Sequence, residues 1–268
     1  ALLQSEHTIE LYDFGVADDG TFYYVMELLD GMDLHEIVRQ FGPMTPARAV
    51  HCLLQVCESL AEAHARGLVH RDIKPSNVYL CRKGLSLDVV KVLDFGLVKA
   101  GTDFVDQSGD LTAEGVIRGT PAFLPPEILQ GSDGIDGRTD LYAVGCLAWW
   151  LLTGRLVFEV DNPMMMAACH LNTAPPSLSE RATQPIPGDL EVLILECLRK
   201  PPRERPATAT ELASRLRAID VGPPWDQESA LLWWQERLDP ADADDARLQL
   251  ATTVARRVAP IDTQPGDE

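Results

Sequence analysis

The spacing of apolar and polar positions changes along this chain, from strand-like runs near its start to helix-like repeats later. The runs at 8–12 and 21–26 are rich in β-branched and aromatic residues, and the polar stretch at 18–20 between them is typical of a tight turn. The pattern therefore predicts an antiparallel hairpin. We expect the tail of a helix in the few residues before it.

Later segments repeat their apolar residues at helical spacing and carry capping signals at their ends. One helix is expected to begin at Thr45-Pro46 and to end before Gly67, because Thr favours the N-cap, Pro the first turn and Gly the position after the last turn. The stretch 141–152 is apolar on every side, which predicts a buried central helix opened by Asp140. The other expected elements are strands at 78–81 and 89–93 and helices at 163–172, 189–200 and 208–219.

Composition and charge limit the classes of function that this chain could have. The 268 residues carry a formal net charge of −18, which argues against a nucleic-acid groove or an anionic membrane as the main partner, because both need clustered Lys and Arg. The longest apolar run, at 141–152, is too short to span a bilayer. The six cysteines are scattered without a C-x-x-C pair, so we expect reduced thiols in a cytoplasmic protein.

Candidate chemistry is concentrated in the stretch 69–77, a loop that Pro75 keeps from becoming a helix. Asp72 can accept a hydroxyl proton, and Lys74 can neutralise charge that develops on phosphoryl oxygens. Asn77 and the later Asp94 offer the hard oxygen ligands that Mg²⁺ prefers. This set of side chains indicates phosphoryl transfer.

The motifs around these residues resemble those of the protein kinase family, and of its bacterial serine/threonine members in particular. H-R-D-x-x-x-x-N and D-F-G stand unaltered, and they are followed in order by G-T-P and P-E. The resemblance implies an α+β, kinase-like fold with a mainly helical large lobe and only the last two small-lobe strands and the hinge. It divides the chain into a small-lobe remnant at 1–26, the hinge and large lobe at 27–219, and an acidic C-terminal extension at 220–268.

The resemblance also implies a nucleotide site for ATP with Mg²⁺. Met26 would be the gatekeeper beside the adenine pocket, although taken alone it is better explained as a core residue that fills a gap. Glu27 and Leu29 belong to the hinge whose backbone pairs with adenine. Asp33 falls where an acidic side chain meets the ribose, and Tyr79 falls on the floor of the adenine pocket.

Other residues are expected to hold this site in shape. His70 and Phe95 look like members of an apolar stack, and Asp140 would fix the backbone of the loop around Asp72. Glu127 needs an arginine partner near the end of the lobe, and Arg205 fits that role. The full set implied by the resemblance is His70, Arg71, Phe95, Gly96, Glu127, Asp140 and Arg205.

The hydrophilic segment 97–124 matches an activation segment. Arg71 suggests control by phosphorylation there, because a guanidinium can hold a phosphate through two hydrogen bonds. Thr112 is the first candidate for modification and Ser108 the second, with an ordinary solvated hydroxyl as the alternative for each. Lys74, two residues after Asp72, together with Thr120 before Pro121 favours serine/threonine over tyrosine specificity. The expected partner is therefore a protein substrate with Ser or Thr.

The C-terminal extension has a formal charge of about −7 and contains three tryptophans, Trp225, Trp233 and Trp234. They lie on or near a helix expected at 227–238, and a second helix is expected at 242–258. Exposed tryptophans are costly, so we expect this segment to dock on the lobe, with binding of a separate partner as the alternative.

Two parts of the family pattern are missing from this sequence. There is no G-x-G before residue 45, and the first lysine is Lys74, whereas the family uses a Gly-rich loop and a strand lysine held by a helix glutamate. We therefore expect a serine/threonine protein kinase chain that lacks most of its small lobe, with those parts upstream of Ala1, and that is inactive or nearly so by itself. A non-catalytic scaffold of kinase-like fold is the alternative, and a small-molecule phosphotransferase fits the long activation segment less well.

Overall fold

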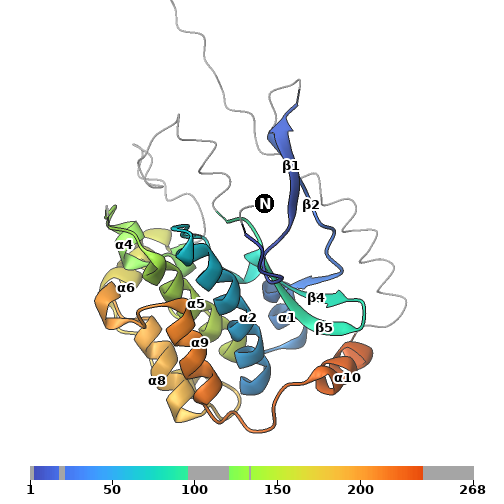
Figure 1. Ribbon diagram of the computed structural model, residues 1–268. Coiled ribbons are helices and arrows are strands. Elements are labelled where there is room, and N and C mark those ends of the chain that lie inside the picture. The colour runs from blue at the N-terminus through green and yellow to red at the C-terminus, as the bar shows by residue number, and fades with distance from the viewer. Residues whose placement is uncertain (1–2, 18–21, 96–120, 133, 238–268) are drawn as a thin grey trace, which may run out of the picture.

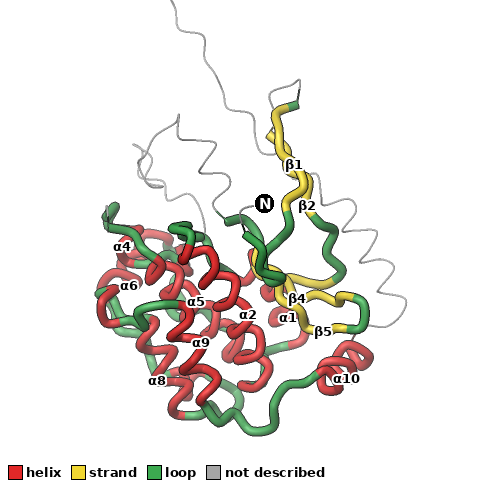
Figure 2. Tube along the Cα trace, viewed as in Figure 1, coloured by secondary structure: helices red, strands yellow, loops and turns green. Residues whose placement is uncertain are grey.

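The computed structural model describes residues 3–17, 22–95, 121–132 and 134–237. Its helices gather into one body, and a two-stranded hairpin rises from one side of that body (Figure 1). The strands of a second, three-stranded sheet lie at the base of this hairpin, between it and the helices (Figure 2). This arrangement agrees with the expected α+β class, a helical lobe with few strands.

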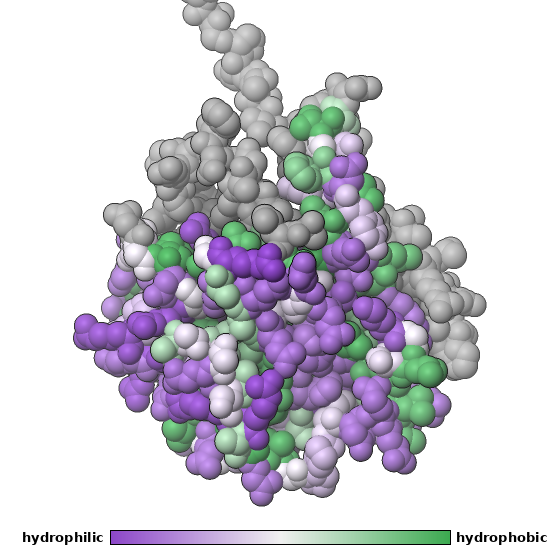
Figure 3. All heavy atoms as spheres, viewed as in Figure 1, coloured by the Kyte–Doolittle hydropathy of each residue, from purple (hydrophilic) through white to green (hydrophobic). Residues whose placement is uncertain are grey.

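The hairpin consists of β1 (Leu11–Val16) and β2 (Phe22–Met26), which pair antiparallel as the sequence predicted. The first strand begins three residues later than expected. Apolar side chains on both strands face solvent, with Phe14 71% exposed, and the space-filling view shows them along the hairpin (Figure 3).

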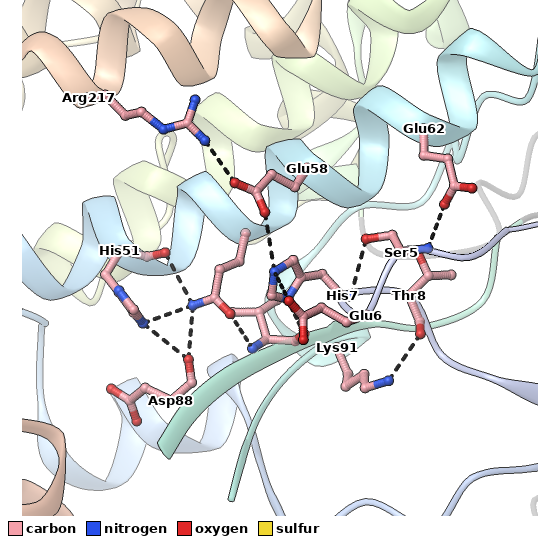
Figure 4. Close-up of polar contacts among 12 residues, drawn as sticks. Ser5, Glu6, His7, Thr8, His51, Glu58, Glu62, Asp88, Lys91 and Arg217 are labelled. Carbon is pink, nitrogen blue, oxygen red and sulfur yellow. Dashed lines mark hydrogen bonds and ion pairs between the residues drawn. The ribbon is translucent and has the colours of Figure 1, made fainter. Parts of the chain in front are cut away.

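The helix tail expected before the hairpin is absent from residues 3–10, the first part of the chain that the structure describes. The backbone amides of Gln4 and Ser5 instead donate to the Glu62 carboxylate, with a Ser5 N to Oε2 distance of 2.7 Å. The Ser5 hydroxyl then accepts from the His7 amide at 3.2 Å. These bonds satisfy the donors that a helix would have used, and they fasten the segment to a helix of the large body (Figure 4).

The three-stranded sheet is antiparallel, in the order β3–β4–β5. Its short first strand was not foreseen, because three residues give no readable alternation. Gly31 in that strand lies so close to its neighbour that a Cβ atom would come within 2.2 Å of the Leu80 carbonyl oxygen. The strands are β3 (Gly31–Asp33), β4 (Val78–Lys83) and β5 (Ser86–Val92).

Two long helices form the centre of the body. The first, α2 (Pro46–Ala65), begins and ends as predicted, with the Thr45 hydroxyl accepting from the Arg48 amide. The second, α5 (Gly137–Thr153), is buried on nearly every side. It begins before the expected position, because Asp136 is its N-cap and accepts from the Arg138 amide at 2.8 Å. Asp140 therefore lies within the first turn and does not open the helix.

The remaining helices surround α2 and α5. Met166 on α6 is buried, whereas Met164 and Met165 are 63% and 59% exposed. Only one face of that helix meets the body. The helices are α1 (Leu34–Phe41), α4 (Pro126–Leu129), α6 (Pro163–Asn172), α7 (Leu178–Arg181), α8 (Gly188–Cys197), α9 (Ala209–Ala218) and α10 (Gln227–Arg237), with 3-10 turns at 75–77, 121–123 and 202–204.

The C-terminal extension turns back onto the body. After α9 the chain runs without helix or strand to α10, which packs against β5 and apart from α8 and α9 (Figure 1). Trp234 is buried in this contact, so the docking expected from the three tryptophans is confirmed. The second helix expected at 242–258 lies outside the described residues. Among the described residues, no helix combines the length and apolar character needed to cross a bilayer.

Candidate active site

Two polar side chains of the predicted catalytic loop converge on the carboxylate of a third residue, Asp72. Lys74 Nζ lies 2.7 Å from Asp72 Oδ2. Asn77 Nδ2 donates to the same oxygen at 2.9 Å and to the Asp72 backbone oxygen at 2.9 Å. The 3-10 turn that Pro75 begins brings Asn77 back toward Asp72. Asn77 is buried, whereas the Asp72 side chain is half exposed and so open to a substrate.

The backbone of this loop is held by Asp140, as expected. Its two carboxylate oxygens accept from the amides of His70 and Arg71, each at 2.8 Å. Arg71 has φ of 67°, a left-handed conformation that costs energy for a residue with a side chain. Charge-assisted bonds from a fully buried carboxylate can offset that strain. The third partner of Asp140 is His64, at the end of α2, whose Nε2 lies 2.7 Å from Oδ2.

Asp94 follows β5. Contacts of the two residues on either side of it bring this part of the chain beside the predicted catalytic loop. The Leu93 amide donates to the Asn77 backbone oxygen at 2.9 Å. His70 Nε2 lies 2.7 Å from the Leu93 carbonyl oxygen, and the His70 and Phe95 rings contact each other with centroids 4.6 Å apart. Asp94 itself is exposed and has a left-handed φ of 57°.

The protonation of His70 follows from its surroundings. Burial lowers the pKa of its imidazole, and the carboxylates of Asp140, Asp72 and Asp94 oppose that shift without cancelling it. His70 is therefore neutral near pH 7. Its Nε2–H donates to the Leu93 carbonyl while Nδ1 accepts from the Asp72 amide at 3.2 Å. A neutral ring with both nitrogens bonded serves as a structural link and not as a general base.

The donor set suits Mg²⁺. The amide nitrogen of Asn77 is bonded to Asp72, which leaves its side-chain oxygen as the atom available to a cation. Asp94 adds an exposed carboxylate, one residue after the Leu93 amide that bonds the Asn77 backbone oxygen. Among the residues that the structure describes, no group of three or more His, Cys, Asp or Glu could hold a metal by itself. Magnesium fits such a site because it keeps several waters and is usually completed by phosphate oxygens.

The residues expected to contact the nucleotide occupy the hinge and the neighbouring sheet. Met26 is 36% exposed, so its interpretation as a plain core residue is wrong. Leu29 is half-buried. Asp33 and Tyr79 stand directly opposite each other on β3 and β4. Asp33 also caps α1, where its Oδ1 accepts from the Glu36 amide at 2.8 Å.

The side chain of Glu27 makes a contact that the sequence did not reveal. Its Oε1 lies 2.5 Å from Lys91 Nζ and accepts from the Glu10 amide at 2.9 Å. Lys91 is buried and also donates to the Thr8 backbone oxygen at 3.3 Å (Figure 4). The hinge is therefore tied to β5, the strand that leads to Asp94.

Glu127 and Arg205 form the expected ion pair. Two parallel bonds of 2.7 and 2.8 Å join the guanidinium to the carboxylate, and the Thr139 hydroxyl donates to Glu127 at 2.9 Å. Burial acts to raise the pKa of the Glu127 carboxyl, but the hydrogen bonds and charge of Arg205 outweigh it and hold the pKa below its usual range.

The described residues do not include four that the sequence singled out: Gly96, Ser108, Thr112 and Thr120. The structure also makes His64 a polar partner of Asp140. Its helical spacing gave no sign of this role, because the partner comes from a different helix much later in the chain.

Comparison with known proteins yields a consistent set of matches. A family model described as protein kinase domain matches residues 1–216. The chain is 40% identical over 219 residues to serine/threonine-protein kinase pkn3 of Myxococcus xanthus, covering 81% of this chain and 40% of that protein. It is 34% identical over 227 residues to serine/threonine-protein kinase PknB of Mycobacterium tuberculosis, covering 84% and 35%. The chain thus spans about two fifths of the length of these relatives.

Solved structures show the same likeness. The crystal structure of the Mycobacterium tuberculosis PknI kinase domain superposes with a TM-score of 0.59 at 26% identity, covering 80% of this chain and 72% of that one. A structure of Rad53 in complex with AMP-PNP gives a TM-score of 0.64 at 23% identity, covering 81% and 52%. The second likeness concerns the fold alone.

Proposed function

Because this chain belongs to the protein kinase family, we propose that it is the greater part of a bacterial-type serine/threonine kinase domain that transfers the γ-phosphoryl group of ATP to protein hydroxyls. The observation that carries this proposal is the convergence of Lys74 and Asn77 on Asp72 Oδ2, at 2.7 and 2.9 Å. The division at 27–219 for the hinge and large lobe is part of the proposal, and the family match over 1–216 supports it.

In the proposed reaction, Asp72 orients the substrate hydroxyl and takes its proton as the oxygen attacks the γ-phosphorus of ATP. The bond from that phosphorus to the β,γ-bridging oxygen breaks, and ADP leaves. Bonds from Lys74 and Asn77 occupy Oδ2, so Oδ1 is the atom we assign to that proton. Lys74 stands beside the carboxylate, where its ammonium group can stabilise charge on the transferred phosphoryl oxygens. Asn77 and Asp94 would hold Mg²⁺, which would neutralise charge on the phosphates of bound ATP.

We assign the nucleotide base to the hinge and the ribose to Asp33. The Glu27 side chain is engaged by Lys91, and the Glu27 backbone amide donates to the Glu10 backbone oxygen at 3.0 Å. We therefore assign the hydrogen bonds with adenine to the Glu27 carbonyl and the Leu29 backbone. Asp33 uses Oδ1 to cap α1, so Oδ2 is the oxygen available to a ribose hydroxyl. Met26 and Tyr79 complete the proposed pocket.

The remaining parts of the proposal concern control and location. Phosphorylation at Thr112, with Arg71 as the phosphate partner, is proposed from the sequence alone, as is the place of Thr120 in the substrate platform. We assign the chain to the cytoplasm, in keeping with its six free cysteines. We also propose that a protein presenting Ser or Thr is its substrate.

We propose further that this stretch of chain transfers phosphate slowly by itself. Its sequence offers no Gly-rich loop before residue 45 and no lysine before Lys74 to hold the α and β phosphates. Exposed apolar side chains along β1 and β2 are consistent with a hairpin that needs a further layer. The same surface favours a second candidate function, a non-catalytic scaffold that binds a partner there.

Phosphate transfer from labelled ATP to a basic protein tests the proposal. Three proteins are compared: the 268-residue chain, a chain extended at its N-terminus, and the extended chain with Asp72→Ala. We expect transfer by the extended chain and a loss of about 10²–10⁴-fold on substitution. Asp161→Ala, which removes an exposed acid away from the loop, is the control. Transfer that survives Asp72→Ala would refute the assigned role, and no transfer by the extended chain would favour the scaffold.

A further inference from the structure

A completely buried carboxylate stands near the start of β5, the strand whose other end leads to Asp94. Asp88 is 0% exposed, and its partner Arg48, in the first turn of α2, is 3% exposed. Arg48 Nε and Nη2 donate to the two Asp88 oxygens at 2.8 and 3.0 Å. Removing such a pair from water is expensive unless further donors surround the carboxylate.

Those further donors come from the C-terminal extension. Trp225 Nε1 donates to Asp88 Oδ2 at 2.8 Å, and Trp234 Nε1 donates to Oδ1 at 2.6 Å. Each oxygen therefore accepts one bond from the guanidinium and one from an indole. Trp233 completes the cover, with its ring 3.6 Å from the Arg48 guanidinium carbon. We call these three residues the tryptophan cap.

A second contact holds the first turn of α10 on the same strand. The side chain of Gln227 accepts from the Leu87 amide at 2.7 Å and donates to the Leu87 carbonyl at 3.0 Å. It thereby bonds the β5 backbone as a neighbouring strand would. Phe41, at the end of α1, also contacts the tryptophan cap. Its ring packs edge-on against the ring of Trp233, with the two centroids 5.0 Å apart.

The capped carboxylate lies at a junction between β5 and α2. The Asp88 backbone oxygen accepts from Gln55 Nε2 at 2.9 Å and contacts His51 Nε2 at 3.3 Å. Gln55 Oε1 then accepts from the Val90 amide at 2.9 Å, so one side chain of α2 holds two positions of β5. Figure 4 shows the contact between His51 and Asp88. Asp94 follows two residues after the end of this strand.

The tryptophan cap lies outside the region that matches the protein kinase family model, whereas the ion pair that it covers lies inside that region. Arg48 and Asp88 lie within the matched region 1–216, whereas all three tryptophans lie beyond it. Most of α10 faces solvent, and the segment that joins it to α9 has no helix or strand. A helix tethered through so short a segment has an effective concentration in the millimolar range, so even a weak site would stay occupied.

We propose that the Arg48–Asp88 pair is a docking site for a tryptophan-bearing helix, that α10 of this chain is its occupant, and that docking determines how firmly β5 is held against α2. The indole N–H groups are the specific element, because they complete the hydrogen bonding of a carboxylate that the body alone leaves half satisfied. This inference does not depend on the proposed catalytic roles.

Hydrogen exchange in the full chain tests the proposal without any measurement of activity. The variant Trp225→Phe/Trp234→Phe keeps aromatic bulk but removes both indole donors. We expect backbone amides of α10 and of residues 89–92 in β5 to exchange about tenfold faster or more, because hydrogen bonds to a charged group are lost. Trp150→Phe is the matched control: within the described part of the chain, its buried Nε1 has no hydrogen-bond partner.

Rescue in trans separates docking from general destabilisation. A synthetic peptide of residues 222–237, added at millimolar concentration to the double variant, should restore protection of β5, and a peptide with Phe at both positions should not. If α10 stays protected in the double variant, the indole bonds are not what holds it. If α10 is released while β5 keeps its protection, or if the two peptides act alike, the proposed coupling is wrong. A double variant that does not fold is replaced by Trp225→Phe alone, judged by the same criteria.

Discussion

Glu127 and Arg205 meet in a buried two-bond ion pair, with N–O distances of 2.7 and 2.8 Å, although 78 residues separate them in the sequence. The guanidinium also donates to the backbone oxygens of Arg138, Arg199 and Lys200. This one side chain therefore joins α4, the first turn of α5 and the segment after α8.

Arg205→Met is expected to lower the free energy of unfolding by about 3–5 kcal/mol, because it leaves the Glu127 carboxylate buried without its partner. Arg203→Met is the matched control, since Arg203 is exposed and lies on the 3-10 turn that Arg205 follows. Urea denaturation of both variants measures the difference. A loss of similar size in the control would show that the turn, and not the ion pair, is responsible.

The same ion pair predicts how stability depends on pH. Because the folded-state pKa of Glu127 is lowered from its ordinary value of 4.5, its contribution is fully present above about pH 4.5 and is lost as the pH falls through the folded-state pKa. Glu127→Gln removes this titration. The stability difference between the wild type and this variant should therefore be constant from pH 7 to about pH 5 and should shrink at lower pH. A difference that grows on acidification would contradict the assignment.

Asp140→Ala removes an acceptor from three donors, His64 Nε2 and the amides of His70 and Arg71. Each buried donor left unsatisfied costs about 1–3 kcal/mol, so we expect a loss of about 3 kcal/mol or more. The amides of His70 and Arg71 should lose their protection from exchange. Asp136→Ala, which removes the N-cap of the same helix, should cost only about 1 kcal/mol and leave the loop protected. Equal effects in the two variants would argue against a specific hold on the loop.

Gly31→Ala is expected to disrupt the pairing of β3 with β4, because the new Cβ would lie 2.2 Å from the Leu80 carbonyl oxygen. Backbone atoms cannot move aside as a flexible side chain can, so we expect a loss of about 1–3 kcal/mol in thermal or urea unfolding. Gly134→Ala, where nothing lies within 4 Å of the added Cβ, is the control. It should be neutral or slightly stabilising.

Much of this architecture could be predicted from short stretches of sequence. The limits of α2 follow from Thr45, Pro46 and Gly67, and the burial of α5 follows from its unbroken apolar composition. The order of the short motifs indicated the family that the comparisons show. Errors arose where a local signal was weak, as in the three-residue β3, or where tertiary contacts replaced it, as in the segment pinned by Glu62.

The sequence by itself determined the hairpin, the long helices and which residue types carry the chemistry, because periodicity, capping and motif spacing act over a few residues. The tertiary structure alone decided which distant side chains meet. It joined His64 to Asp140, Glu27 to Lys91, and two tryptophans of the extension to Asp88. Such pairs form only when whole elements pack, since burial then requires each polar group to find a partner wherever the fold places one.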